Sequence, residues 1–434
     1  MNINLENLQN TILNDPVYRE LFLLSKELNS NVYIVGGILR DYLTGMFNKN
    51  TDMDFTSDKA LKLAKKFSKR TGGSFVMLDQ EEETGRVIIK KDRDSELIMD
   101  FSQTRGNNII DDIYKRDFTI NSIALSFNDC FSGNKCNFID PSGGIDDIRK
   151  KVIRVVSENS LSDDPLRMVR AFRFASKLNF DISPDTITLI ENQKEKIIKV
   201  SRERIETEIF KLLDSDQSCR YVKQMYESGL FMAIIPEIKH QNWNIYEKLE
   251  KLLSGEFIHM FPEYSDEIKF YITGSSRKSM IKFGLLLHGE EKVIEDICRN
   301  LKMSNYKTDS VTRIVTYYRD ILQEKDKINN IFILDFFRKT GDDGLAILLT
   351  ALCAGIISKE GVIHILTIYY TRIKPLWESP RLIKGHDLIE LFNLKPGPDF
   401  KKILYLIEEQ QVEENIKTRE EALKFVREFI VYGL

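Results

Sequence analysis

The character of the sequence changes near residue 146. Before this point, short apolar runs of strand type alternate with helical stretches and polar turns. After it, nearly every segment carries apolar residues at the spacing of an amphipathic helix, interrupted by turns rich in Gly, Pro or Asn. This order predicts an α+β protein. A mixed α/β head with a small sheet is followed by an all-α neck, body and tail.

The head contains apolar runs of strand length and at least two helical stretches, 38–44 and 59–70. A polar turn at 91–95 separates the last two runs and predicts a hairpin. The expected strands are Val32–Val35, the run containing Asp54 and Phe55, Ser74–Leu78, Arg86–Lys90 and Leu97–Phe101.

A chain of 434 residues is too long for one compact domain, so two to four packed units are expected. Motif positions and turn signals place the boundaries between the parts. The expected parts are a mixed α/β head at 1–140, a helical neck at 141–215, a helical body at 216–330 and a helical tail at 331–434.

Composition limits the classes of protein to consider. The apolar share of 42% and the charged share of 30% are typical of an ordinary globular chain. The N-terminus shows no signal-peptide pattern, and the longest apolar run, 345–357, is too short to span a bilayer. We therefore expect a cytoplasmic protein with no membrane partner. The net charge is only −3, so a nucleic-acid surface would have to be a local basic patch.

The cysteines are scattered, odd in number and never arranged as CxxC. This pattern indicates free thiols in a reducing compartment and no zinc site. The five are Cys130, Cys136, Cys219, Cys298 and Cys353.

Two aspartates in the head, Asp52 and Asp54, are two residues apart on an expected strand, so their side chains point to the same face. Converging carboxylates repel each other unless a cation lies between them, and such hard oxygen ligands suit Mg²⁺. The preceding Gly36-Gly37 would let backbone amides approach phosphate oxygens. On spacing alone, a solvated aspartate pair beside a tight turn is about equally plausible. Asp100 is a candidate third carboxylate or an ordinary strand-end aspartate.

Several segments match, in the same order, the motifs of a known family. They read YIVGGILRDYLTG and TDMDF within 33–55, KRDFTINSIA at 115–124, DPSGGIDD at 140–147, DDPLRMVRA at 163–171 and SRERIETEIFKLL at 201–213, with KGHDLIELFNLKPGPDF and TREEALKF in the tail. On these motifs the chain resembles the class II tRNA nucleotidyltransferases of the polymerase-β superfamily, which include CCA-adding enzymes and bacterial poly(A) polymerases. The stretch 217–377 is identified only as helical.

The resemblance implies untemplated transfer of nucleotides from CTP or ATP to the 3′ end of tRNA, with Mg²⁺ as cofactor. It implies that Asp52 and Asp54 are the catalytic metal ligands. Nucleotide-binding roles are implied for Gly36, Gly37, Arg40, Arg116, Asp117, Asn121, Asp164, Arg167 and Arg170.

Asp164 and Arg167 are implied as the pair that reads the base. Three residues apart at the start of an expected helix, they should lie on one face. Cytosine and adenine each present an amino donor beside a ring-nitrogen acceptor, which an Asp acceptor and an Arg donor match. Uracil and guanine present the reverse order. A helix-surface ion pair without function is the competing interpretation.

The connection between the Asp100 strand and Arg116 is short, at 102–112. Full CCA-adding relatives usually carry a longer flexible loop here, which is associated with the switch from CTP to ATP. The short connection favours a CC-adding enzyme that leaves the final A to a separate A-adding enzyme. A full CCA-adding enzyme, a bacterial poly(A) polymerase and a catalytically inactive RNA-binding module remain alternatives.

A second metal site of the HD phosphohydrolase type is not expected. His288 lacks a following aspartate, and His386-Asp387 stands alone in the tail motif. Lysines and arginines near the Pro-Gly breaks of the tail are candidates for RNA contacts.

Overall fold

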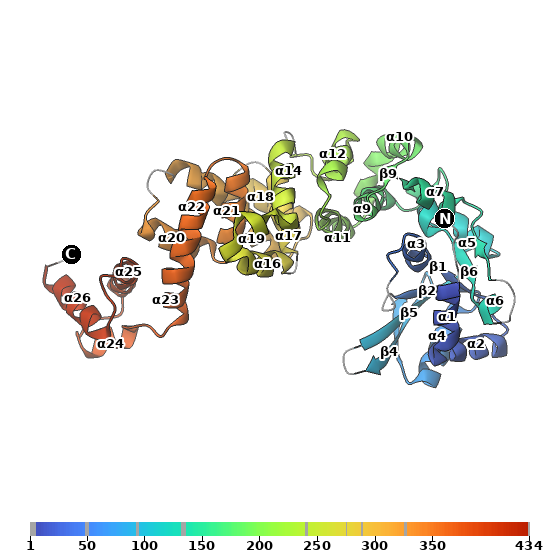
Figure 1. Ribbon diagram of the computed structural model, residues 1–434, viewed down its shortest axis with the longest axis horizontal. Helices are drawn as coiled ribbons and strands as arrows, with labels where there is room; N and C mark the ends of the chain where they lie inside the picture. Colours follow the sequence, from blue (N-terminus) through green and yellow to red (C-terminus); the bar gives the residue numbers. More distant parts are fainter. Residues whose placement is uncertain are drawn as a thin grey trace. The chain divides into compact units, whose positions relative to one another are not determined.

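The structure is a computed structural model that describes residues 6–47, 52–92, 95–131, 136–238, 242–274, 276–287, 290–324 and 328–432. His288 lies outside the described residues. The chain divides into two compact units. The first comprises residues 1–208 and 220–234, and the second 209–219 and 235–434 (Figure 1). The four-part division expected from the sequence stays a prediction.

The first unit is built on a seven-stranded sheet with the order β3-β4-β5-β2-β1-β6-β7. β2 and β5 pair in parallel, and the other neighbours pair antiparallel. The predicted strands and the 91–95 hairpin are confirmed. The strands are β1 (Val32–Val35), β2 (Met53–Ser57), β3 (Ser74–Asp79), β4 (Thr84–Asp92), β5 (Ser95–Gln103), β6 (Ala124–Ser126) and β7 (Phe138–Ile139).

Alternation along β2 separates the core from the site. Met53 and Phe55 are buried, and Phe55 stacks on Phe101 of β5 with ring centroids 5.3 Å apart. The intervening Asp54 points to the opposite face. Helix α4 packs on β4 and β5, and α2 packs on α4 (Figure 1).

Helices complete the head and form the neck. A two-stranded parallel sheet, β8 (Val152–Ile153) with β9 (Asp181–Ile182), interrupts the neck. The helices are α1 (Glu6–Asn14), α2 (Pro16–Glu27), α3 (Gly37–Leu43), α4 (Ala60–Thr71), α5 (Ile109–Tyr114), η1 (Thr119–Asn121), α6 (Phe127–Phe131), α7 (Gly144–Lys150), α8 (Ser160–Asp163), α9 (Arg167–Leu178), α10 (Pro184–Gln193), η2 (Lys194–Lys199), α11 (Arg202–Leu213), α12 (Cys219–Glu227) and α13 (Leu230–Ile234).

The second unit is helical over its described residues and contains two apolar cores. One gathers residues of α14 to α17 and of α19 to α22, and a smaller one joins α24, α25 and α26. Its helices are α14 (Trp243–Lys251), η3 (Leu252–Glu256), α15 (Phe257–Met260), η4 (Pro262–Tyr264), α16 (Ser265–Thr273), α17 (Arg277–Leu286), α18 (Glu291–Asn300), α19 (Asn305–Glu324), α20 (Asn330–Thr340), α21 (Asp343–Cys353), α22 (Lys359–Ile368), η6 (Tyr369–Ile373), α23 (Lys374–Glu378), α24 (Gly385–Glu390), α25 (Pro398–Val412) and α26 (Arg419–Tyr432). Among the described helices, none has the length and apolarity needed to cross a membrane.

The prediction of five free thiols is wrong for two of them. Cys130 and Cys136 form a disulfide, with Cα atoms 5.2 Å apart. Cys130 lies on α6 and Cys136 shortly before β7, which pairs with β6, so both sulfurs come close to the Ser126 carbonyl oxygen at the end of β6. Spacing along the chain could not indicate this return. Cys219, Cys298 and Cys353 are free.

Candidate active site

Asp54 lies near the start of β2, beside the end of β1. Its Cα pairs with that of Val35, just before Gly36, which has a φ of +78°. A Cβ on Gly36 would lie 2.9 Å from Asp54 Oδ2, so both the backbone conformation and the close approach require glycine. Burial and the nearby Asp100 raise the pKa of Asp54 to about 6.

Asp100 lies opposite Asp54 in the parallel β2–β5 register. Its two oxygens are held by Arg86 of β4, with Nε–Oδ1 and Nη2–Oδ2 distances of 2.8 Å. A bidentate pair of this kind satisfies a carboxylate. Among the described residues, no three acidic, histidine or cysteine side chains converge closely enough to hold a metal. A role for Asp100 as a third ligand stays a prediction.

The donor set at Asp52 and Asp54 fits a divalent cation. Both are hard oxygen ligands, and burial together with the neighbouring Asp100 raises the pKa of Asp54, a shift that a bound cation would oppose. The Arg116 and Arg40 guanidinium groups oppose the upward shift without cancelling it. Asp52 is exposed and is the first described residue after 47.

A cavity of about 450 Å³ opens beside Asp54, a volume suited to a nucleotide. All of the predicted nucleotide-binding residues line it, whereas Asp52 lies outside its lining. Four further residues that line the cavity were not predicted from the sequence: Arg105, Arg173, Phe174 and Lys177. Three of these lie on α9 three, four and seven residues after Arg170. That spacing was a usable signal.

A chain of polar contacts links the walls of this cavity. Arg40 Nη1 donates to Asn121 Oδ1 at 2.7 Å, and Asn121 Nδ2 donates to Asp117 Oδ1 at 3.1 Å. Arg170 Nη2 donates to Asp117 Oδ2 at 2.6 Å. Burial alone would raise the pKa of Asp117, but the Arg170 guanidinium and these hydrogen bonds hold it below its usual range. The ionised Asp117 therefore orients Arg170 and Asn121.

Asp164 and Arg167 both line the cavity, but the prediction that they share a helix face is wrong. Asp164 is extended, with φ −141° and ψ 99°, because the following Pro165 disfavours the helical conformation in the residue before it. Its oxygens accept from the Leu166 amide at 3.2 Å and from Arg204 at 3.0 Å.

Arg167 begins α9 and is held by main-chain carbonyl groups. Its guanidinium donates to the oxygens of Lys115, Arg116 and Ser160 at 2.9, 3.0 and 3.2 Å. Burial lowers the pKa of Arg167, although a guanidinium stays charged at neutral pH. These three carbonyl groups fix the orientation of the Arg167 guanidinium before any ligand binds.

Phe174 places its ring among three guanidinium groups of the cavity. The ring centroid lies 3.9 Å from Arg173 Cζ, 5.2 Å from Arg40 Cζ and 5.3 Å from Arg170 Cζ. The ring is 6% exposed, and a buried aromatic face attracts cations. It therefore offsets some of the mutual repulsion of the arginines.

The connection from β5 to α5 is folded against the head. The Arg105 amide donates to Asp112 Oδ1 at 3.1 Å, and its guanidinium donates to Glu82 at 3.0 Å. Asp112 is buried and also binds Arg116 at 2.7 Å. Asn108 caps α5 by accepting from the amides of Ile110 and Asp111. The connection thus delivers Arg105 and Arg116 to the cavity together.

Models of known families match most of this architecture. Residues 32–154 match the poly A polymerase head domain, and residues 179–242 match the probable RNA and SrmB-binding site of polymerase A. Residues 274–426 match domain 2 of tRNA nucleotidyltransferases. The chain belongs to the class II tRNA nucleotidyltransferase family. The head match contains Asp52, Asp54 and the KRDFTINSIA segment.

Relatives within this family span nearly the whole chain. A CC-adding tRNA nucleotidyltransferase of Synechocystis sp. is 27% identical over 91% of this chain and 92% of its own length. An A-adding tRNA nucleotidyltransferase of Halalkalibacterium halodurans is 25% identical over 98% and 96%. A solved structure of a CCA-adding enzyme with CTP shares the fold, with a TM-score of 0.75, 21% identity and 99% coverage of both chains. Family members of different product specificity thus resemble this chain to similar degrees.

The tail dipeptide His386-Asp387 has a structural explanation. Asp387 is bound by Arg419 of α26 and accepts the Lys384 amide at 2.7 Å, which caps α24. Hydrogen bonds from Arg419 hold the pKa of Asp387 below its usual range. Both contacts stabilise the tail.

Proposed function

We propose that this protein is a tRNA 3′-end nucleotidyltransferase that transfers CMP from CTP without a template and stops before the final A. One observation carries the proposal. A single cavity brings the Asp54 carboxylate, a cationic wall and the Asp164–Arg167 pair together. Transfer requires a polyphosphate, a reacting hydroxyl and a selected base at one place, and these groups meet those three needs.

The reaction joins the 3′-oxygen of the RNA to the α-phosphorus of CTP, while the bond to the departing pyrophosphate breaks. Arg40, Arg116 and Arg170 would bind the phosphates, and Gly36 leaves backbone room for their oxygens. A Mg²⁺ ion held by Asp52 and Asp54 would align the hydroxyl and neutralise the phosphates. The Asp117 network keeps the arginine forks in place before substrate arrives.

Base selection would rest on Asp164 and Arg167. The Asp164 carboxylate accepts from an exocyclic amino group, and Arg167 donates to the adjacent ring nitrogen. Because three carbonyls already hold the Arg167 fork, its direction is stable without a nucleic-acid template. Cytosine and adenine satisfy this pair, whereas uracil and guanine leave it unpaired.

The choice of CC over CCA rests on the connection between β5 and α5. Only residues 104–108 lie between these elements, and Asp112 and Glu82 hold Arg105 within them. A short connection held by these contacts is poorly suited to move. Such movement would be needed to change the base-binding pocket from one that accepts a pyrimidine to one that accepts a larger purine. This supports a product that ends in CC, with a separate enzyme adding the A. A full CCA-adding enzyme remains the second candidate.

The product assay distinguishes the candidates. We expect that a tRNA ending at the discriminator base gains two C residues in CTP and no A when ATP is also present. Gel electrophoresis at nucleotide resolution measures the added length, and sequencing identifies it. Addition of CCA would contradict the short-connection argument, and long poly(A) products would contradict the tRNA assignment. No incorporation at all would indicate an inactive RNA-binding module.

Replacing Phe174 with leucine is expected to raise the KM for CTP by about tenfold with a smaller change in kcat. Each cation–π contact contributes about 0.5–2 kcal/mol, and 1.4 kcal/mol corresponds to tenfold in binding. Steady-state kinetics with varied CTP measures both constants. Phe172→Leu is the matched control, because Phe172 lies on the same helix and is fully buried. Phe174→Tyr should keep a normal KM; equal losses in Phe172→Leu and Phe174→Leu would indicate a packing effect alone.

A further inference from the structure

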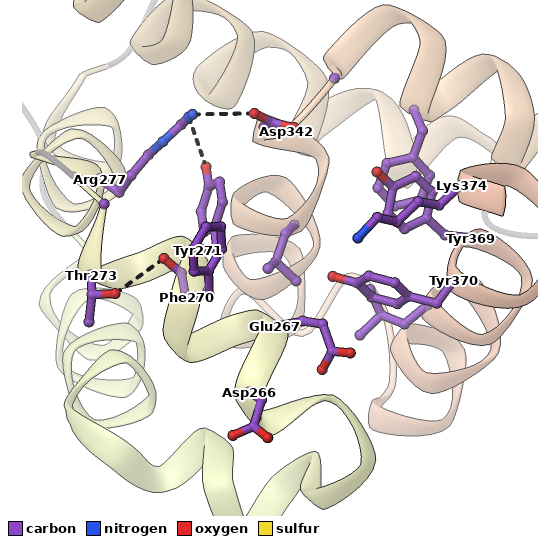
Figure 2. A pocket seen from close by; sticks show the side chains of 15 residues that line it. Asp266, Glu267, Phe270, Tyr271, Thr273, Arg277, Asp342, Tyr369, Tyr370 and Lys374 are labelled. Carbon is purple, nitrogen blue, oxygen red and sulfur yellow. Dashed lines mark hydrogen bonds and ion pairs between the residues drawn. The ribbon is translucent and has the colours of Figure 1, made fainter. Parts of the chain in front are cut away.

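The helical second unit contains a cavity of about 620 Å³ that the proposed reaction does not use. Its walls come from α16 and α17 and from α20, α21, α22, η6 and α23 (Figure 2). All lining residues lie within 266–374, whereas the active-site cavity is lined by residues 36–177. The volume is in the range of small-molecule sites.

Aromatic rings form much of the wall. Phe337 and Tyr369 stack with centroids 3.7 Å apart, and Tyr370 meets Tyr369 edge to face at 5.0 Å. Phe270 on α16 lines the same cavity and is 84% exposed. An aromatic ring left so exposed at the rim of an aromatic cavity is available to stack on a flat ligand.

The two cationic side chains of the cavity, Arg277 and Lys374, differ in how strongly other residues bind them. Arg277 is already bound by Asp343 at 2.6 Å and lies 3.7 Å from Asp342. Lys374 has its amine 5.4 Å from the centre of the Tyr370 ring, and its ion pair with Glu378 is a loose contact of 3.9 Å between solvated side chains.

Two carboxylates, Asp266 and Glu267, come from α16. Among the described residues, neither has a hydrogen bond or ion pair. Figure 2 shows the Lys374 amine and the Glu267 carboxylate on two sides of the Tyr370 side chain. Among the described lining residues, the cavity thus presents the weakly held Lys374 ammonium, two carboxylate acceptors and aromatic surface between them.

We propose that this cavity binds a single nucleotide carrying one phosphate. The base would stack on Phe270, its amino group or the ribose hydroxyls would donate to Asp266 and Glu267, and the phosphate would contact Lys374. A triphosphate is disfavoured, because Lys374, the one cation with only weak contacts among the described lining residues, faces two carboxylates. A simple organic cation is disfavoured, because the Lys374 amine already occupies the face of Tyr370. Both a free nucleotide and one residue of an RNA carry this chemistry.

Photocrosslinking of the full-length protein tests the site. One arm uses 8-azido-AMP, and the other uses a short RNA containing one 8-azidoadenosine. Mass spectrometry then identifies the labelled peptides. We expect label between residues 266 and 274 or between 369 and 374, with AMP competing at least about fivefold better than ATP. Label from the free nucleotide, from the RNA or from both upholds the site and identifies its source.

Variants separate the contributions of single side chains. Phe270→Leu and Lys374→Gln should each reduce labelling in these peptides by about tenfold, and Lys374→Arg should retain it. The exposed Lys248 on α14 lies outside the cavity, so Lys248→Gln is the matched control. Phe270 is too exposed for its loss to unfold the protein, and a melting curve checks this.

Label confined to peptides of the first unit would overturn the proposal, as would competition by spermidine equal to that by AMP. Labelling that survives both Phe270→Leu and Lys374→Gln would also overturn it. The proposal stands apart from the CMP-transfer assignment, because its readout is the labelled peptide and not the tRNA product. Wild-type protein that transfers CMP but shows no label here would refute this site alone.

Discussion

Replacing Asp54 with asparagine is expected to lower the rate of CMP transfer by at least about a thousandfold. Removing one of the two carboxylates proposed to bind the metal should cost several kcal/mol of transition-state stabilisation, and each 1.36 kcal/mol is tenfold in rate. Single-turnover incorporation of CMP into tRNA under saturating CTP measures the effect. Asparagine keeps the size of the side chain, so the geometry at Gly36 is preserved.

The stability of this variant tells whether the loss is chemical. The fold opposes ionisation of Asp54, whose pKa is raised to about 6 by burial and by Asp100. The ionised form therefore destabilises the metal-free protein above that pH, and this destabilisation fades as the pH falls toward the unfolded-state pKa. In EDTA at pH 8, the melting temperature of Asp54→Asn should equal or exceed that of the wild type. A marked decrease would indicate misfolding.

Asp185→Asn is the matched control for charge. Its side chain is 86% exposed on α10 and outside the cavity. Activity of this variant should equal that of the wild type. Residual transfer above about one per cent in Asp54→Asn would contradict a metal-ligand role for Asp54.

Replacing Asp164 with alanine is expected to reduce the preference for CTP over UTP by about 10- to 100-fold. The mismatched uracil edge would place an acceptor against the Asp164 carboxylate, at a cost of about 1–3 kcal/mol, and the variant lacks this cost. The ratio of kcat/KM for the two nucleotides, measured on the same tRNA, gives the effect directly. Affinity for the divalent cation should change little, because Asp164 is not among its expected ligands.

Asp163→Ala is the matched control, since Asp163 is the exposed neighbour and does not line the cavity. Asp164 also binds Arg204, so Arg204→Gln separates loss of the ion pair from loss of base reading. We expect Arg204→Gln to keep most of the selectivity. Unchanged discrimination in Asp164→Ala would refute the edge-reading role.

The sequence alone determined the features that depend on local order. Alternation in β2 placed Asp54 away from the Met53 and Phe55 side of the strand, and the order of motifs indicated the family before any fold was available. Helical spacing predicted that the segments after residue 146 are mainly helical. These predictions succeeded because periodicity and short motifs need only neighbouring residues.

Contacts between distant segments were decided by the tertiary structure. The β4–β5 register places Arg86 opposite Asp100, so that the two side chains pair. Pro165 keeps Asp164 in an extended conformation before α9 begins. Packing of α9 against the head brought Phe174 to Arg40, more than a hundred residues away.

The paired cysteines and the cavity of the second unit belong to the same class of feature. Cys130 and Cys136 meet because β7 returns to β6, and Phe270 and Tyr370 line one cavity because α16 and η6 enclose it. Such contacts follow from register and packing between elements, which no local pattern encodes. The sequence therefore predicted roles for Asp54, Asp164 and Arg167, and the tertiary structure determined which side chains hold them in place.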